Sequence, residues 1–141
     1  MTKTLVDTNI LIYAVERNEQ SKHEAAIAVI DELSEHKDMV IGSQNLAEFS
    51  KVLLEKTNPP QKSSDIVTHI FDFISFGSVI SYSEDTVVRA ISISKEYGIH
   101  YFDALLVATM QENGISKIVT ENTRDFKKIG WLEAVNPFKS K

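Results

Sequence analysis

Residues 4–11 read TLVDTNIL, and this stretch decides how the rest of the chain is interpreted. Its first three residues are a short run with β-branched and apolar side chains, which is typical of a strand buried on both faces. The run ends at Asp7, where a helix is expected to begin. Because parallel strands need a crossover connection, a buried strand that leads into a helix indicates a parallel sheet.

Three similar runs follow at residues 39–42, 78–81 and 117–120, and we expect each to be a strand buried on both faces. Between them, apolar residues recur every three to four positions, as in helices with one buried face. The two helices between the second and third strands should form a hairpin, as the only departure from simple alternation. The pattern predicts a three-layer α/β/α sandwich around a mostly parallel sheet of four to five strands.

Composition narrows the class of protein further. The 141 residues are 43% hydrophobic, contain no cysteine and carry a net charge of −5, so we expect one domain over residues 1–141, without disulfides or thiolate-bound metals. No signal peptide is expected, and the longest apolar run is too short for a membrane span. A soluble, cytoplasmic protein is expected. The negative charge argues against general nucleic-acid binding, because phosphate contacts require Lys and Arg.

Polar side chains gather where the predicted strands end, which is where open parallel sheets bind ligands. Each of them has a structural explanation as a helix cap or first-turn residue, and Asn45 with Glu48 has capping-box spacing. We nevertheless treat the set as candidate site residues: Asp7, Thr8, Asn9, Ser43, Glu48, Asp103, Thr120, Asn122 and Asp125.

Taken together, the acids favour a metal site. Carboxylates gathered at one sheet edge repel one another and raise each other's pKa unless a cation intervenes. Mg²⁺ or Mn²⁺ suits such ligands, because hard divalent ions prefer carboxylate and water oxygens. A site of this kind can activate water and hold a scissile phosphate, as in metal-dependent nucleases.

The ordered set of motifs resembles a PIN domain, and more narrowly the VapC-type toxins of toxin–antitoxin pairs. The motifs are LVDTNIL at 5–11, NLAE at 45–48, Asp103-Ala104, and TENTRDF at 120–126. The resemblance covers the full chain and implies an Mg²⁺- or Mn²⁺-dependent endoribonuclease. It implies metal ligands at Asp7 and Asp103, and Glu48 as a ligand or water-orienting base. It also implies a homodimer and a small antitoxin partner.

The fourth acidic position departs from the family pattern. Many relatives carry an aspartate where this chain has Asn122. We favour Asp125 as the fourth catalytic and metal-binding residue, with Asn122 as a neutral ligand, whereas the adjacent Glu121 is the remaining alternative. Thr8 and Asn9 would support the site, and Ser43 and Thr120 would line it. Whether one or two metal ions bind stays open.

Two other functions remain compatible with the sequence. The chain could be a catalytically silent PIN-type module that binds RNA or acts as a scaffold, or a PIN nuclease of RNA processing. A receiver-like signalling domain is disfavoured, because it needs an acidic pair after the first strand and an aspartate after the third. Candidate contacts to RNA phosphates are Arg17, Lys51, Arg89 and Lys95.

Overall fold

The structure is a computed structural model that describes residues 2–138. Its central sheet is parallel throughout, with the strand order β3-β2-β1-β4-β5. This confirms the predicted parallel sheet of four to five strands. The strands are β1 (Thr4–Val6), β2 (Met39–Gly42), β3 (Ser78–Ile80), β4 (Lys117–Val119) and β5 (Glu133–Val135).

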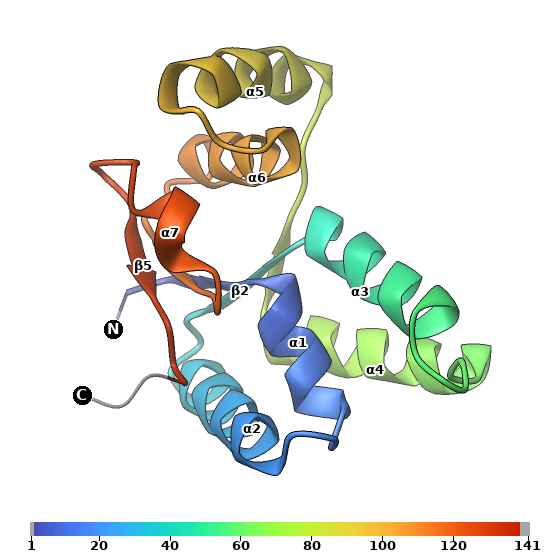
Figure 1. The fold of residues 1–141 in the computed structure, drawn as a ribbon. Coiled ribbons are helices and arrows are strands. Elements are labelled where there is room, and N and C mark those ends of the chain that lie inside the picture. Colours follow the sequence, from blue (N-terminus) through green and yellow to red (C-terminus); the bar gives the residue numbers. More distant parts are fainter. Residues whose placement is uncertain (1, 139–141) are drawn as a thin grey trace.

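Helices cover both faces of this sheet. In Figure 1, α5 and α6 lie on one side, and the helices from α1 to α4 lie on the other. None of the helices between residues 2 and 138 is long and apolar enough to cross a bilayer. The helices are α1 (Thr8–Val15), α2 (Gln20–Glu35), α3 (Ser43–Glu55), α4 (Ser63–Phe76), α5 (Glu84–Tyr97), α6 (Tyr101–Glu112) and α7 (Thr123–Phe126).

The strands alternate their side chains between two apolar cores, as a two-residue period requires. Leu5 and Ile118 pack with α5 and α6, whereas Val6 and Val119 pack with the helices on the other face. Complete burial of each such side chain contributes roughly 1.5–3 kcal/mol. These two cores confirm the three-layer α/β/α sandwich.

Three expectations about the elements were wrong. Helix pairs connect β1 to β2 and β3 to β4 as well as β2 to β3, so the hairpin between the second and third strands is not exceptional. β3 is not buried on both faces, since it lies at the sheet edge and Val79 is 40% exposed. β5 was not predicted, because Glu133-Ala134-Val135 lacks a continuous apolar run.

Candidate active site

The site lies between β1 and β4, where the order in which the chain adds strands to the sheet reverses. The chain leaves β1 toward β2, and β4 pairs with the opposite side of β1, so a crevice opens beyond the carboxyl ends of β1 and β4. Asp7 follows β1 and Thr120 follows β4. The buried Thr120 hydroxyl donates a hydrogen bond to Asp7 Oδ2 at 2.7 Å. The two strand ends therefore meet through a side chain that the sequence placed in the site.

Asp7 is held from two further directions. As N-cap of α1, its Oδ1 accepts from the Thr8 backbone N–H at 2.8 Å. The amide of Asn45 donates to the same oxygen at 3.3 Å. Burial raises the pKa of the Asp7 carboxyl, and the hydrogen bonds from Thr120 and Thr8 oppose that rise. The helix-cap explanation is thus correct for Asp7, and the residue also lines a pocket at this crevice.

Asn45 is a supporting residue that the sequence interpretation assigned to a capping box with Glu48. That assignment was wrong, because α3 begins at Ser43 and Asn45 Oδ1 accepts from the Gly42 backbone N–H at 3.0 Å. Its Nδ2 also donates to Thr8 Oγ1 at 3.0 Å. Asn45 is fully buried and lies on the same face of α3 as the buried Phe49. A polar residue on an otherwise apolar helix face was therefore the feature of the sequence that could have identified Asn45 as a supporting residue.

Glu48 and Asp103 complete a group of three carboxylates. Thr8 Oγ1 donates to Glu48 Oε1 at 3.0 Å. The pKa of Glu48 is raised by burial and then by the charges of Asp7 and Asp103. Asp103 lies in the first turn of α6, where burial and the charges of Asp7 and Asp125 raise its pKa to about 6. These carboxylates are close enough to repel one another.

A pocket of about 380 Å³ collects most of the predicted residues. A neighbouring hollow of about 670 Å³ shares Asp103 and Asn122 with it and adds Asp125. Ser43 begins α3 and lines neither cavity, whereas Thr120 lies behind Asp7. The predicted residues that line the 380 Å³ pocket are Asp7, Thr8, Asn9, Glu48, Asp103 and Asn122.

The loop after β4 is fixed by Asn9. The amide of Asn9 donates to Thr120 Oγ1 at 3.4 Å, and its Oδ1 accepts from the Glu121 backbone N–H at 3.2 Å. The Asn122 backbone N–H also donates to Thr120 Oγ1, at 3.1 Å. These contacts hold Asn122 at the pocket rim while the Thr120 hydroxyl is directed at Asp7.

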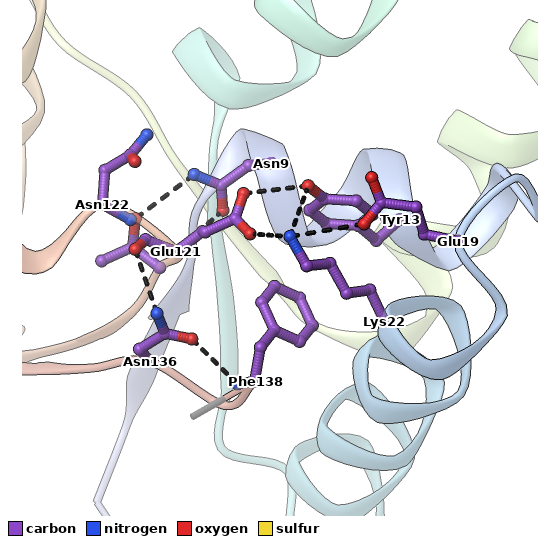
Figure 2. Close-up of polar contacts among 9 residues, drawn as sticks. Asn9, Tyr13, Glu19, Lys22, Glu121, Asn122, Asn136 and Phe138 are labelled. Carbon is purple, nitrogen blue, oxygen red and sulfur yellow. Dashed lines mark hydrogen bonds and ion pairs between the residues drawn. The ribbon is translucent and has the colours of Figure 1, made fainter. Parts of the chain in front are cut away.

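Glu121 belongs to a different cluster. Figure 2 shows its carboxylate turned toward Tyr13 and Lys22, away from the side chain of Asn122. Lys22 Nζ lies 2.5 Å from Glu121 Oε2, and the Tyr13 hydroxyl donates to Oε1 at 2.9 Å. The Lys22 ammonium also lies 5.1 Å and 5.6 Å from the ring centroids of Tyr13 and Phe138. Glu121 is therefore neutralised within the protein.

The side chains that line the pocket offer the oxygen ligands that a hard divalent cation prefers. Asp7, Glu48 and Asp103 have no ion pair with any residue between 2 and 138, and the side chains around them offer oxygen ligands. Within the same range, no three acidic, histidine or cysteine side chains converge to coordination distance. A bound ion would therefore have to draw these carboxylates together.

The fold and the carboxylates at the crevice between β1 and β4 together define a class of protein. Comparison of the sequence with profiles of protein families identifies that class. The chain belongs to the PIN domain family, whose sequence profile matches residues 4–132. No curated protein gives a significant match.

Solved structures share the fold at low sequence identity. A toxin–antitoxin complex from Klebsiella pneumoniae is 24% identical, with 95% of this chain and 97% of that chain covered and a TM-score of 0.65. VapBC2 from Rickettsia felis, bound to a DNA fragment from their promoter, is 22% identical, with 94% and 97% covered and a TM-score of 0.68. VapC20 from Mycobacterium tuberculosis, a sarcin-ricin loop cleaving toxin, is 16% identical, with 82% and 86% covered and a TM-score of 0.59.

Proposed function

We propose that this protein is an endoribonuclease that depends on Mg²⁺ or Mn²⁺ and forms one nuclease domain over residues 1–141. One observation carries the proposal: Asp7, Glu48 and Asp103 share a pocket at the PIN-domain crevice and form no ion pair with any residue between 2 and 138. Burial, and after it their mutual repulsion, raises the pKa of Glu48 and of Asp103. A structural acid would normally gain an ion-pair partner, whereas these three carboxylates have none within residues 2–138, and a cation that draws them together would relieve their repulsion.

Asp7 and Asp103 would hold the ion, with Glu48 as a further ligand or base and Asp125 supplying the fourth carboxylate from the adjoining hollow. When bound, the ion would activate water and neutralise phosphate charge. Thr120 keeps Asp7 in one orientation through its 2.7 Å hydrogen bond.

Glu48 would take the proton of the attacking water, because its raised pKa makes it a better base than an exposed glutamate. Attack by the resulting hydroxide on the phosphorus would break the bond to the 3′ oxygen, which takes a proton from solvent, so that the products end in a 5′-phosphate and a 3′-hydroxyl. Products that end in 2′,3′-cyclic phosphate would instead identify the ribose hydroxyl as nucleophile and contradict this mechanism.

The decisive experiment is incubation of purified protein with total RNA, in Mg²⁺ or in EDTA. The Asp7→Asn and Asp103→Asn variants are tested beside it. We expect discrete cuts that require the metal and disappear in both variants. The absence of three converging acids within residues 2–138 favours a second candidate, a catalytically silent PIN-type RNA-binding module. Intact RNA with folded, inhibitor-free protein under every condition would support that candidate.

We further propose that the nuclease is the toxin of a type II toxin–antitoxin pair. The support is the likeness in fold to solved toxin–antitoxin complexes. Induced expression should arrest growth, and co-expression of a small neighbouring gene should relieve the arrest. A nuclease of RNA processing would not need such a partner. Because the proposed substrate is cellular RNA, we place the activity in the cytoplasm.

The proposed toxin would act as a homodimer. Exposed apolar side chains on α4 offer a surface for it, with Phe71 66% exposed and Ile74 43% exposed. Light scattering coupled to size exclusion should give twice the 15.9 kDa chain mass. A monomer that keeps full activity would contradict this part of the proposal.

A further inference from the structure

The carboxylate pocket is the middle of three adjoining hollows. On one side it shares Asp103 and Asn122 with the 670 Å³ hollow beside α7. On the other side it shares Ile12 and Lys56 with a hollow of about 750 Å³ beside the loop after α3. We call these three hollows, which adjoin through the shared residues, the trough. A strand lying in the trough would pass directly over the carboxylates.

Charges in the pocket and the α7 hollow cancel. The four carboxylates of Asp7, Glu48, Asp103 and Asp125 face four cations, of which two lie on each side. On the α3 side the cations are Lys51 and Lys56, and on the α7 side they are Arg124 and Lys128. Without a bound metal this part of the trough has no net attraction for a polyanion, and the hollow beside the loop after α3 adds Lys62 against Glu16 and Asp65. Neutralising the acids leaves the cations to bind phosphate.

The two sides differ in how many of their cations already contact other groups of the protein. Lys128 Nζ lies 3.6 Å from Asp125 Oδ1 and donates to the Gly98 carbonyl at 3.2 Å. Arg124, the other cation on the α7 side, makes no ion pair or side-chain hydrogen bond within residues 2–138. Neither do the exposed side chains of Lys51 and Lys56, so the α3 side holds two such cations and the α7 side holds one. An ammonium group without a partner can take a phosphate without breaking a contact. The α3 side is therefore the better place to bind the backbone of a strand.

The pocket that holds three of the acids and the two lysines also has an apolar part. Ile12 of α1 and Val52 of α3 line the pocket and are half-buried. Such a surface suits the ribose and the face of an unstacked base. Because these side chains form no hydrogen bonds, they would not select one base over another. An A-form duplex keeps its bases stacked and paired, so that only a single strand can place a nucleotide here.

We propose that single-stranded RNA lies along the trough, with one nucleotide on Ile12 and Val52 and the adjacent phosphates on Lys51 and Lys56. The inference rests on the proposed ribonuclease function, because it places a substrate strand relative to the proposed cleavage site. It assigns Lys51 and Lys56 as substrate-positioning residues and predicts contact with a single strand in preference to a duplex.

The test measures binding apart from cleavage. A 5′-labelled single-stranded RNA is titrated with Asp103→Asn protein in Mg²⁺ over a range of salt concentrations, using fluorescence anisotropy. The same protein carrying Lys51→Glu and Lys56→Glu should bind at least about tenfold more weakly. The slope of log affinity against log salt should fall by about 1.4, since each phosphate contact to a single strand contributes about 0.7.

Lys37→Glu is the control, since Lys37 is exposed just before β2, at the opposite end of the strands from the site, and lines none of the three hollows. It should leave the slope unchanged. An unchanged slope in the double variant, or equal affinity for a duplex of the same sequence, would overturn the inference even if the wild-type protein cleaves RNA. Failure of the wild-type protein to cleave RNA would instead contradict the proposed function, and the binding slopes would still decide this inference.

Discussion

Helix α6 carries an acid at each end, and the two have opposite surroundings. Glu112, its last residue, forms an ion pair with Arg89 and accepts from Thr86 Oγ1 at 2.6 Å. The hydrogen bond from Thr86 and the charge of Arg89 lower the pKa of Glu112. Asp103, in the first turn, has no such cation and its pKa is raised to about 6.

The helix dipole alone would lower the pKa of Asp103 and raise that of Glu112, the reverse of these two shifts. A carboxylate is favoured near the N-terminus of a helix and disfavoured near the C-terminus, typically by 0.3–1 kcal/mol. Here the neighbours dominate, because burial and the charges of Asp7 and Asp125 outweigh the favourable position of Asp103. Glu112 is an acid that the fold neutralises, whereas Asp103 forms no ion pair within residues 2–138 and is a proposed metal ligand. The same distinction separates Glu121, paired with Lys22, from Glu48 in the pocket.

Replacing a glutamate by glutamine in each region should give the largest contrast. Glu48→Gln removes the proposed base and should lower the cleavage rate by roughly 10²–10⁴-fold. Glu112→Gln makes the same chemical change outside the pocket and should leave the rate within about twofold, because Glu112 lines none of the trough hollows. Single-turnover cleavage of a labelled RNA measures both. Equal losses in the two variants would refute the distinction.

A second contrast uses two buried threonines that each donate to an acid. Thr120→Val removes the 2.7 Å hydrogen bond to Asp7, and should lower activity about 10- to 100-fold, as loss of a ligand's supporting contact does. Thr86→Val removes the contact to Glu112 and should lower the melting temperature without this loss of activity. Steady-state cleavage and thermal unfolding of both variants separate the effects. A fully active Thr120→Val protein would show that Asp7 needs no such support.

The sequence was informative wherever the determinants are local. Apolar runs located β1, β2 and β4, and the residues directly after β1 and β4 supplied Asp7 and Thr120. The side chains that contact those residues come from distant segments, and no periodic pattern in the sequence shows which segments will meet. Lys22 meets Glu121 across 99 positions, so only the folded chain shows why Glu121 leaves the pocket.

A third prediction concerns stability at different pH in the metal-free protein. The pKa of Asp103 rises from 3.8 unfolded to about 6 folded, so the folded state holds its proton more tightly. Stability is therefore lost as pH rises from about 4 to about 6, because the folded carboxyl must then ionise. The full shift would correspond to roughly 3 kcal/mol. Since Asp103 is only half-buried, solvent screening reduces this to about 1 kcal/mol.

Asp103→Asn should accordingly raise the melting temperature by about 3 °C above pH 6 and have no effect below about pH 4. Added Mg²⁺ should stabilise the wild-type protein and have less effect on the variant. Thermal unfolding from pH 4 to pH 8, with and without Mg²⁺, measures both. A destabilised variant at pH 7.5 without metal would show that Asp103 is satisfied within the fold, as Glu112 is.

The smallest expected effect tests which acid fills the fourth position. Glu121→Gln keeps the hydrogen-bonding shape beside Tyr13 but removes the charge opposite Lys22, and should cost about 0.5 kcal/mol of stability while leaving cleavage within twofold. Asp125→Asn removes a carboxylate that raises the pKa of Asp103, and should lower cleavage and weaken Mg²⁺ binding. Titration of both variants with Mg²⁺ makes the comparison. Weaker binding in Glu121→Gln alone would move the fourth ligand to Glu121, and would require its carboxylate to leave Lys22 when the metal binds.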